Sequence, residues 1–119
     1  MTEVTIRHNP DRERFEVLVA GNVIGKAAYK TYDAGDSPQR IFYHTVINEE
    51  YGGQGLAGKL ATAALDETVA DGLDIVPVCP YIKKFLTKHP AYARSTAATT
   101  PAHLEFLSGA LAAARAGRE

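Results

Sequence analysis

The amino-acid sequence predicts an α+β fold, built from a mixed but mostly antiparallel sheet with helices packed against it. Two observations lead to this prediction. Residues 4–47 read as short β-rich runs separated by turn residues, which is typical of antiparallel strands. From Gly55 onward apolar residues recur every three to four positions, which is typical of amphipathic helices. A chain of 119 residues is long enough for one core of this kind.

Antiparallel hairpins are expected in the first part of the chain. Apolar and polar side chains alternate from Phe15, the pattern breaks at Gly21-Asn22, and it resumes at Val23. A polar loop containing glycine and proline is expected at residues 33–40. The next strand, residues 41–47, has apolar character on both of its faces, so we expect it to lie inside the sheet.

The second half of the chain predicts a helix, a short strand and a second helix. The first helix begins near Gly55 and ends near Gly72, which suits a C-terminal cap. Its apolar stripe consists of Leu56, Ala57, Leu60, Ala61, Ala64, Leu65 and Val69. Residues 73–79 form a short buried strand, in which Pro77 indicates interrupted pairing or an edge position. Pro80 then suits the first position of the next helix.

A last amphipathic helix is expected near the C-terminus. Thr100 suits an N-cap position, and Pro101 suits the first helical turn. The predicted apolar face of this helix consists of Leu104, Leu107, Leu111 and Ala114.

Composition restricts the classes of partner. The net charge of -1 gives no general attraction to nucleic acid or to an anionic membrane. The longest apolar runs fall well short of the roughly 20 residues that span a membrane, and the charged start lacks a signal-like segment. We therefore expect a cytoplasmic protein without nucleic-acid or membrane partners. The single cysteine, Cys79, rules out an internal disulfide and a multi-cysteine zinc site, and we expect no metal.

Three glycines in the middle of the chain match a nucleotide-binding pattern. Gly53, Gly55 and Gly58 form a G-x-G-x-x-G sequence, which occurs in dinucleotide-binding folds. Such folds place an acidic residue after the next strand, whereas Asp74 precedes that strand. Too little chain remains to build the rest of a dinucleotide-binding sheet. The pattern alone also fits a glycine-rich surface turn that caps an ordinary helix.

The motifs on either side of the glycines favour a different interpretation of the turn. HTVI at residues 44–47, GGQGLA at 52–57 and PVCPY at 77–81 occur in order. Together they resemble the GNAT superfamily of acetyl-CoA-dependent N-acetyltransferases, in particular its compact single-domain group. The resemblance covers residues 15–92 and implies a GNAT-like fold with a splayed central strand pair. It implies a domain at 1–95, with 96–119 a helical extension on the same domain or on a partner subunit of a homodimer.

The resemblance also implies a binding site for acetyl-CoA as cosubstrate. Glycines allow the backbone to approach a pyrophosphate, and the unpaired N–H groups at a helix start favour anions. Lysines nearby are candidate phosphate contacts, although solvated lysines are common on helices. The candidate cofactor-binding residues are Thr45, Val46, Ile47, Gly52, Gly53, Gln54, Gly55, Leu56, Ala57, Lys59 and Lys84. Relatives often carry arginine where this chain has Gly52.

Three residues are candidates for the chemistry. Cys79 precedes a helix whose dipole favours a thiolate, so it suits a nucleophile or a base, or it is a small buried side chain. Tyr81 is placed to protonate the departing CoA sulfur or to pack against the sheet. His44 is a candidate base or a structural histidine, and a water molecule is a further candidate base. Val46 stands where many relatives carry a glutamate, so the usual carboxylate base is missing.

These features favour an acetyl-CoA-dependent N-acetyltransferase that acts on a primary amine, either a small molecule or a protein lysine. A CoA-binding module with little or no turnover is the alternative that the missing carboxylate suggests. A nucleotide-binding or oligomerisation domain is a third alternative, in which the glycine pattern is coincidental. The oligomeric state, monomer or homodimer, stays open from the sequence.

Overall fold

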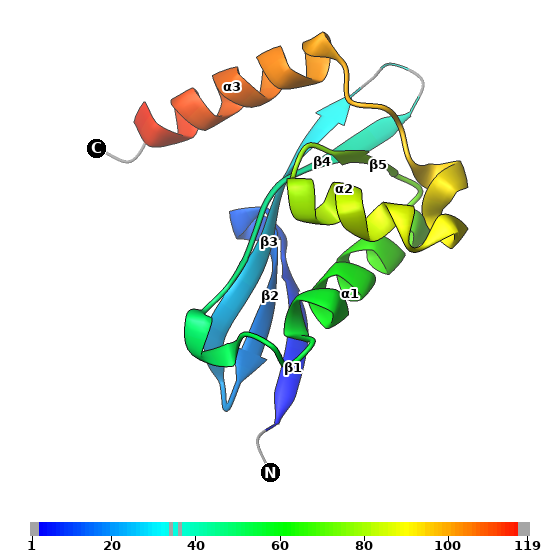
Figure 1. The fold of residues 1–119 in the computed structure, drawn as a ribbon. Coiled ribbons are helices and arrows are strands. Elements are labelled where there is room, and N and C mark those ends of the chain that lie inside the picture. Colours follow the sequence, from blue (N-terminus) through cyan, green and yellow to red (C-terminus); the bar gives the residue numbers. More distant parts are fainter. Residues whose placement is uncertain (1–2, 34, 36, 117–119) are drawn as a thin grey trace.

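The computed structural model describes residues 3–33, 35 and 37–116, and its fold combines one sheet with helices on both faces (Figure 1). The five strands are β1 (Val4–Asn9), β2 (Arg14–Val19), β3 (Asn22–Asp33), β4 (Pro38–Ile47) and β5 (Asp74–Pro77). The α-helices are α1 (Leu56–Ala70), α2 (Pro80–Thr87) and α3 (Pro101–Ala116). Short 3-10 turns are η1 (Pro10–Arg12), η2 (Glu49–Tyr51) and η3 (Pro90–Ser95). The predicted α+β class is confirmed.

The strands lie side by side in sequence order, from β1 to β5. The first four pair antiparallel, and β5 pairs parallel with β4. Thus β4 is an interior strand and β5 is an edge strand, as the apolar run at 41–47 and Pro77 indicated. The predicted bounds of the loop at residues 33–40 were wrong at both ends. Strand β3 extends to Asp33, and β4 already begins at Pro38 because Gln39 and Arg40 pair with β5.

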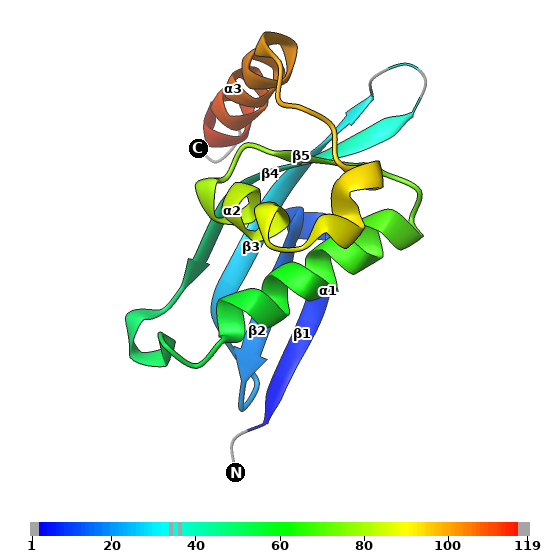
Figure 2. The same cartoon turned by 45° about the vertical axis from the view of Figure 1, so that its right-hand side comes forward.

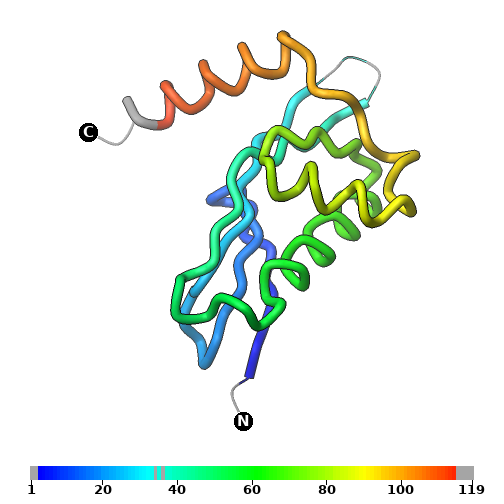
Figure 3. Tube along the Cα trace, viewed as in Figure 1, coloured from blue at the N-terminus to red at the C-terminus, as the bar shows by residue number. Residues whose placement is uncertain are grey.

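Two layers of helices enclose different parts of the sheet (Figures 2 and 3). Helices α1 and α2 cover one face, which we call the inner face, and α3 lies against the opposite, outer face. The inner core joins the sheet to both helices through residues such as Phe15, Phe42, Leu60 and Ile82. A smaller outer cluster contains Ile41, Val76 and Leu107.

Helix α1 buries the predicted stripe with one correction. Val69 is 40% exposed, whereas Thr68 is fully buried. The Thr68 hydroxyl donates to the Ala64 carbonyl at 2.7 Å and accepts from Arg40 Nη1 at 3.0 Å. The guanidinium of Arg40 lies 4.5 Å from the centroid of the Tyr29 ring. A buried cation therefore turns the polar residue inward, where periodicity alone favoured the apolar one.

Helix α3 begins as predicted but presents a different face to the sheet. The Thr100 hydroxyl accepts from the His103 amide at 3.3 Å, which makes Thr100 the N-cap. Leu107 is buried, but Leu104 is 50% exposed, so its predicted inward position was wrong. His103 is buried instead and shares a 2.7 Å hydrogen bond with Gln39 Oε1. Residues 117–119 of the predicted extension lie outside the described residues.

A carboxylate is buried on the outer face, away from α3. Glu16 is 1% exposed and is bound by Arg7 Nη2 at 2.5 Å, Arg14 Nε at 2.6 Å and Asn9. Burial opposes its ionisation, but the hydrogen bonds from Arg7, Arg14 and Asn9 hold the pKa of this carboxyl below its usual value. Glu16 therefore stabilises the folded state as an anion.

We expect Glu16→Gln to lower the free energy of unfolding by about 1 to 3 kcal/mol at pH 7, because the arginines lose a charged partner. A lowered pKa contributes stability above the usual carboxyl pKa, and this stability disappears as pH falls through the folded-state pKa. Urea unfolding at pH 7 and near pH 3 should show a difference that shrinks in acid. Glu105→Gln, on the exposed surface of α3, is the control. Equal stability of Glu16→Gln and wild type at pH 7 would contradict this account.

Candidate functional site

An opening in the sheet lies between β4 and β5. The two strands pair only from Gln39 to Phe42 on β4. The amides of Val78 and Cys79 then both donate to the Phe42 carbonyl, at 3.0 and 2.8 Å, and the chain turns into α2. Within the described residues, β4 beyond Phe42 has no strand partner on this side. The predicted splay is therefore present, and main-chain groups along this edge of β4 are free to meet a ligand.

A β-bulge lies at the start of the open edge. Ala28 pairs with His44 and Tyr29 pairs with Phe42, so Tyr43 is an extra residue on β4. After the bulge, His44 and Val46 face the outer side of the sheet. Thr45 and Ile47, which pair with Ala27 and Gly25, face the inner side. Nothing in the sequence signals this bulge, so the extra residue at Tyr43 was not predicted.

The glycine turn connects the end of β4 to α1. Gly53 and Gly55 have φ values of 80° and 74°, in the left-handed region that favours glycine. A Cβ at either position would meet no atom within 4 Å, so conformation rather than space requires glycine there. Gly55 is the N-cap of α1. Gly52 has φ -67° and ψ 152°, an extended conformation that any residue can adopt, but a Cβ there would lie 3.2 Å from the Glu49 carbonyl oxygen, a tight contact.

The start of α1 faces a groove shared with α2. The N–H groups of the first helical turn, from Leu56 and Ala57 onward, lack intrahelical acceptors. The groove holds about 690 Å³ and is lined by residues that include Gly55, Gly58, Lys59, Thr62, Phe85 and His89. A helix start with free N–H groups beside such a groove suits an anionic ligand.

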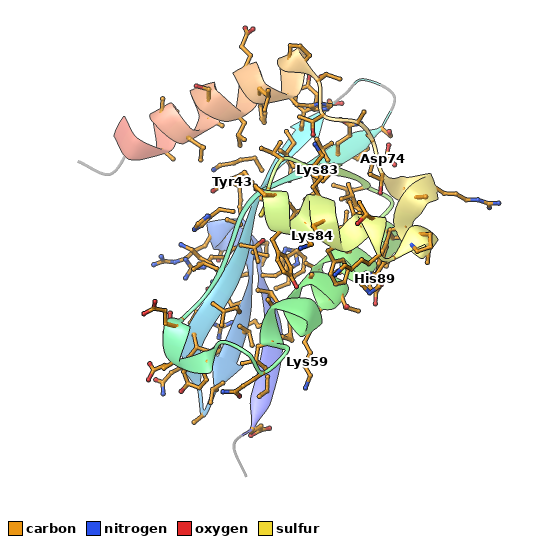
Figure 4. All side chains as sticks on the ribbon, viewed as in Figure 1. Tyr43, Lys59, Asp74, Lys83, Lys84 and His89 are labelled. Atoms are coloured by element: carbon orange, nitrogen blue, oxygen red, sulfur yellow. The ribbon has the colours of Figure 1, made fainter. Side chains whose placement is uncertain are left out.

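Figure 4 places the two candidate lysines on different helices. Lys59 lies in the first turns of α1 and Lys84 on α2, and both side chains are exposed. A Cβ at Gly58 would meet the Tyr81 hydroxyl at 3.9 Å, an ordinary contact, so close packing does not require glycine at this position. The first turn of α1 faces α2 at this point.

The three candidate catalytic residues occupy different sides of the opening. Cys79 is the N-cap of α2, is 4% exposed, and directs Sγ at the Thr45 hydroxyl at 3.5 Å. Tyr81 is 37% exposed, and desolvation raises the pKa of its hydroxyl, so it is protonated at neutral pH. His44 is exposed on the outer face. The fold thus brings Cys79 and Thr45 together and places His44 across the strand from them.

No three histidine, cysteine, aspartate or glutamate side chains in residues 3–33, 35 and 37–116 are grouped so that they could hold a metal ion. None of the helices described is both long enough and apolar enough to cross a membrane.

The arrangement of splay, glycine turn and helix matches a known family. Residues 14–95 match the model of the GCN5-related N-acetyl-transferase family. The chain belongs to this family. It is 34% identical to Protein NATD1 of Bos taurus over 85 residues, which cover 71% of this chain and 75% of that protein. It is 33% identical to Protein NATD1 of Homo sapiens over the same length, with the same coverage of both chains.

Solved structures share the fold at low identity. An aminoglycoside acetyltransferase from an uncultured soil metagenomic sample, in complex with sisomicin, matches with a TM-score of 0.52 and 19% identity over 70% of this chain. A ribosomal-protein-alanine N-acetyltransferase from Brucella melitensis biovar Abortus 2308 matches with a TM-score of 0.52 and 17% identity over 73% of this chain. The chain spans only 55% and 62% of these two structures, respectively.

The conformations of the turn glycines predict unequal effects of substitution. We expect Gly55→Ala to lower the free energy of unfolding by about 1 to 2 kcal/mol, because a side chain is strained at φ 74°. Gly52→Ala should lower it by less than Gly55→Ala does, under about 1 kcal/mol, because its backbone is extended and the Cβ meets only the Glu49 carbonyl oxygen, at 3.2 Å. Chemical denaturation of the two variants measures the difference. A neutral Gly55→Ala would show that the left-handed turn is not maintained.

Proposed function

We propose that this chain is an acetyl-CoA-dependent N-acetyltransferase, which transfers the acetyl group of the CoA thioester to a primary amine. The observation that carries the proposal is a continuous path. The open edge of β4 begins beside Cys79 and leads to the glycine turn at the start of α1. A ligand with an anionic end and an extended amide-containing arm fits such a path, and CoA has both.

The anionic end of CoA is assigned to the glycine turn. Backbone N–H groups from Gly53 to Ala57 would bind the pyrophosphate, since the left-handed glycines leave the space in front of them open. Lys59 and Lys84 are exposed at the groove side of α1 and on α2, where they suit the remaining phosphates. The pantetheine arm would pair with the main chain of Thr45, Val46 and Ile47 along the open edge.

A mechanism in which the Cys79 thiol acts as the nucleophile suits the residues at the opening. Strand β4 carries no carboxylate to act as a base, and Cys79 lies at the apex of the splay. After its proton leaves through the Thr45 hydroxyl to solvent, the Cys79 sulfur attacks the acetyl carbon. The bond from that carbon to the CoA sulfur breaks, and the leaving thiolate takes the proton of Tyr81, which solvent later replaces.

The second half of the reaction consumes the acetyl group held on Cys79. The acceptor nitrogen attacks the thioester carbon, the bond to the Cys79 sulfur breaks, and the thiolate is regenerated. His44 takes the proton that the acceptor nitrogen loses. Its exposed position on the outer face suits this role, because α1 and α2 cover the inner face, whereas the outer side of β4 is exposed at His44.

A CoA-binding module with little turnover is the second candidate. The observation that favours it is Val46, an apolar and exposed side chain on a strand without a carboxylate. Both candidates bind CoA, and only the first produces an acetylated amine. An acceptor screen that detects free CoA thiol separates them.

We expect acetyl-CoA and CoA to stabilise the protein and NAD to leave it unchanged. A ligand at 100 times its dissociation constant adds about 2.7 kcal/mol to the free energy of unfolding. Gly52→Arg should lower the dissociation constant of CoA about tenfold, because the extended backbone allows a side chain, after a small shift from the Glu49 carbonyl oxygen, and a guanidinium there can reach the pyrophosphate. Gly52→Ala is the matched control. Thermal unfolding and calorimetry provide the data, and stabilisation by NAD alone would overturn the assignment.

Incubation with acetyl-CoA and no amine should leave an adduct of about 42 Da on Cys79, the mass of one acetyl group. Peptide mapping locates it, and an added amine should remove it. Cys79→Ala should lose the adduct and transfer at least about 100-fold more slowly, while it still binds CoA. Thr45→Val, which keeps Cys79, should form the adduct more slowly, because it removes the hydroxyl that takes the Cys79 proton to solvent. Unchanged transfer by Cys79→Ala would show that the thiol has a packing role only.

A further inference from the structure

We propose that the acceptor is an amine that also carries a carboxylate or phosphate group, and that Lys26 and Arg14 bind this group on the outer face of the sheet. The inference rests on the proposed acetyl transfer and adds the chemical class of the acceptor. Three features support it: the route that the fold leaves open, the charges along that route, and a hollow between them.

Among the described residues, the outer side of β4 at His44 and Val46 offers an exposed approach to the open edge. Helices α1 and α2 pack over the inner face, where Cys79 and Thr45 meet. Helix α3, which lies outside the family match at 14–95, packs on the outer face against Ile41 and Val76 and partly covers Tyr43. The outer face next to His44 and Val46 remains exposed. An acceptor therefore reaches the acetyl group over β3 and β2.

Two rows of cross-strand neighbours line this approach on the outer face of the sheet. Arg7, Glu16, Lys26 and Val46 are successive partners from β1 to β4, and Asn9, Arg14, Ala28 and His44 form the adjacent row. Three cations, Arg7, Arg14 and Lys26, thus surround one carboxylate, which leaves an excess of two positive charges. The surface that leads to His44 is therefore basic, although the whole chain has a net charge of -1.

Lys26 is the cation best placed to meet an acceptor. Within the described residues it has no ion-pair partner, because Glu16 is bound by Arg7 and Arg14. Its Cα pairs with that of Val46, about 5 Å away, and Arg14 lies two strands, about 10 Å, from His44. A hollow of about 330 Å³ joins Arg14, Lys26 and Val46. An anionic group there would lie within about 10 Å of an amine at His44.

The same charges disfavour polycations. A polyamine would place several ammonium groups beside Lys26 and Arg14, and like charges in close contact oppose binding. The acidic residues Glu49 and Glu50 of η2 do not line the hollow. The expected acceptor thus differs in charge from the sisomicin bound to the structurally similar aminoglycoside acetyltransferase.

The test uses labelled peptides with one acceptor lysine, flanked by glutamate, phosphoserine, glutamine or arginine, together with a polyamine. Binding to the full chain with CoA present is measured by anisotropy at low salt, and acetylation is measured separately. We expect the glutamate and phosphoserine peptides to bind about tenfold more tightly than the glutamine peptide and the arginine peptide to bind most weakly. The ratio of the two anionic peptides distinguishes carboxylate from phosphate recognition.

Lys26→Glu should reverse this order, and Lys26→Gln should abolish it. Arg94→Glu, an equal change of charge on the exposed η3, is the matched control and should leave the order unchanged. Tighter binding of the arginine peptide or polyamine to wild type, or the same order for Lys26→Glu, would overturn the inference. Binding in the expected order without acetylation of any acceptor would contradict the proposed function and support the charge assignment.

Discussion

The site depends on the point where β5 stops pairing with β4. Pro77 has no N–H to continue the ladder, so the amides of Val78 and Cys79 both turn to the carbonyl of Phe42. Pro80 then fixes the start of α2 directly after Cys79. These constraints end the strand, place a thiol at the apex and leave the remaining edge of β4 open. A β5 that continued in register would have closed the sheet and removed the site.

The elements around β4 leave its edge open and hold the strand in place from both faces of the sheet. Helix α1 packs on the inner face through a buried stripe, and Thr68 ties its last turns to Arg40 of β4. That attachment fixes the helix whose first turn presents free N–H groups to the groove. On the outer face, α3 packs against Ile41 of β4 and Val76 of β5. Elsewhere on that face, Glu16 forms ion pairs with Arg7 of β1 and Arg14 of β2. The two faces therefore offer different surfaces, and we propose that the inner one serves CoA and the outer one the amine acceptor.

The sequence predicted the elements better than the contacts between them. Proline, glycine and threonine act locally, so Pro80, Gly55 and Thr100 marked helix starts correctly. The bulge at Tyr43 could not be predicted, because it arises from the pairing of β4 with β3. The inward face of α3 was wrong at Leu104 because the His103–Gln39 hydrogen bond spans 64 residues. Likewise, the charged row on the outer face exists only once four strands are in register.

CoA is proposed to lie along the open edge of β4 with its pyrophosphate at the start of α1. An acetyl-CoA titration, followed by NMR through the backbone amide signals of the full chain, tests this placement directly. We expect large shifts for Gly53, Gly55 and Leu56, and for Thr45 to Ile47, while the amides of α3 stay unchanged. Shifts confined to α3 or to the outer ends of β1 and β2, with the glycine turn unaffected, would contradict it.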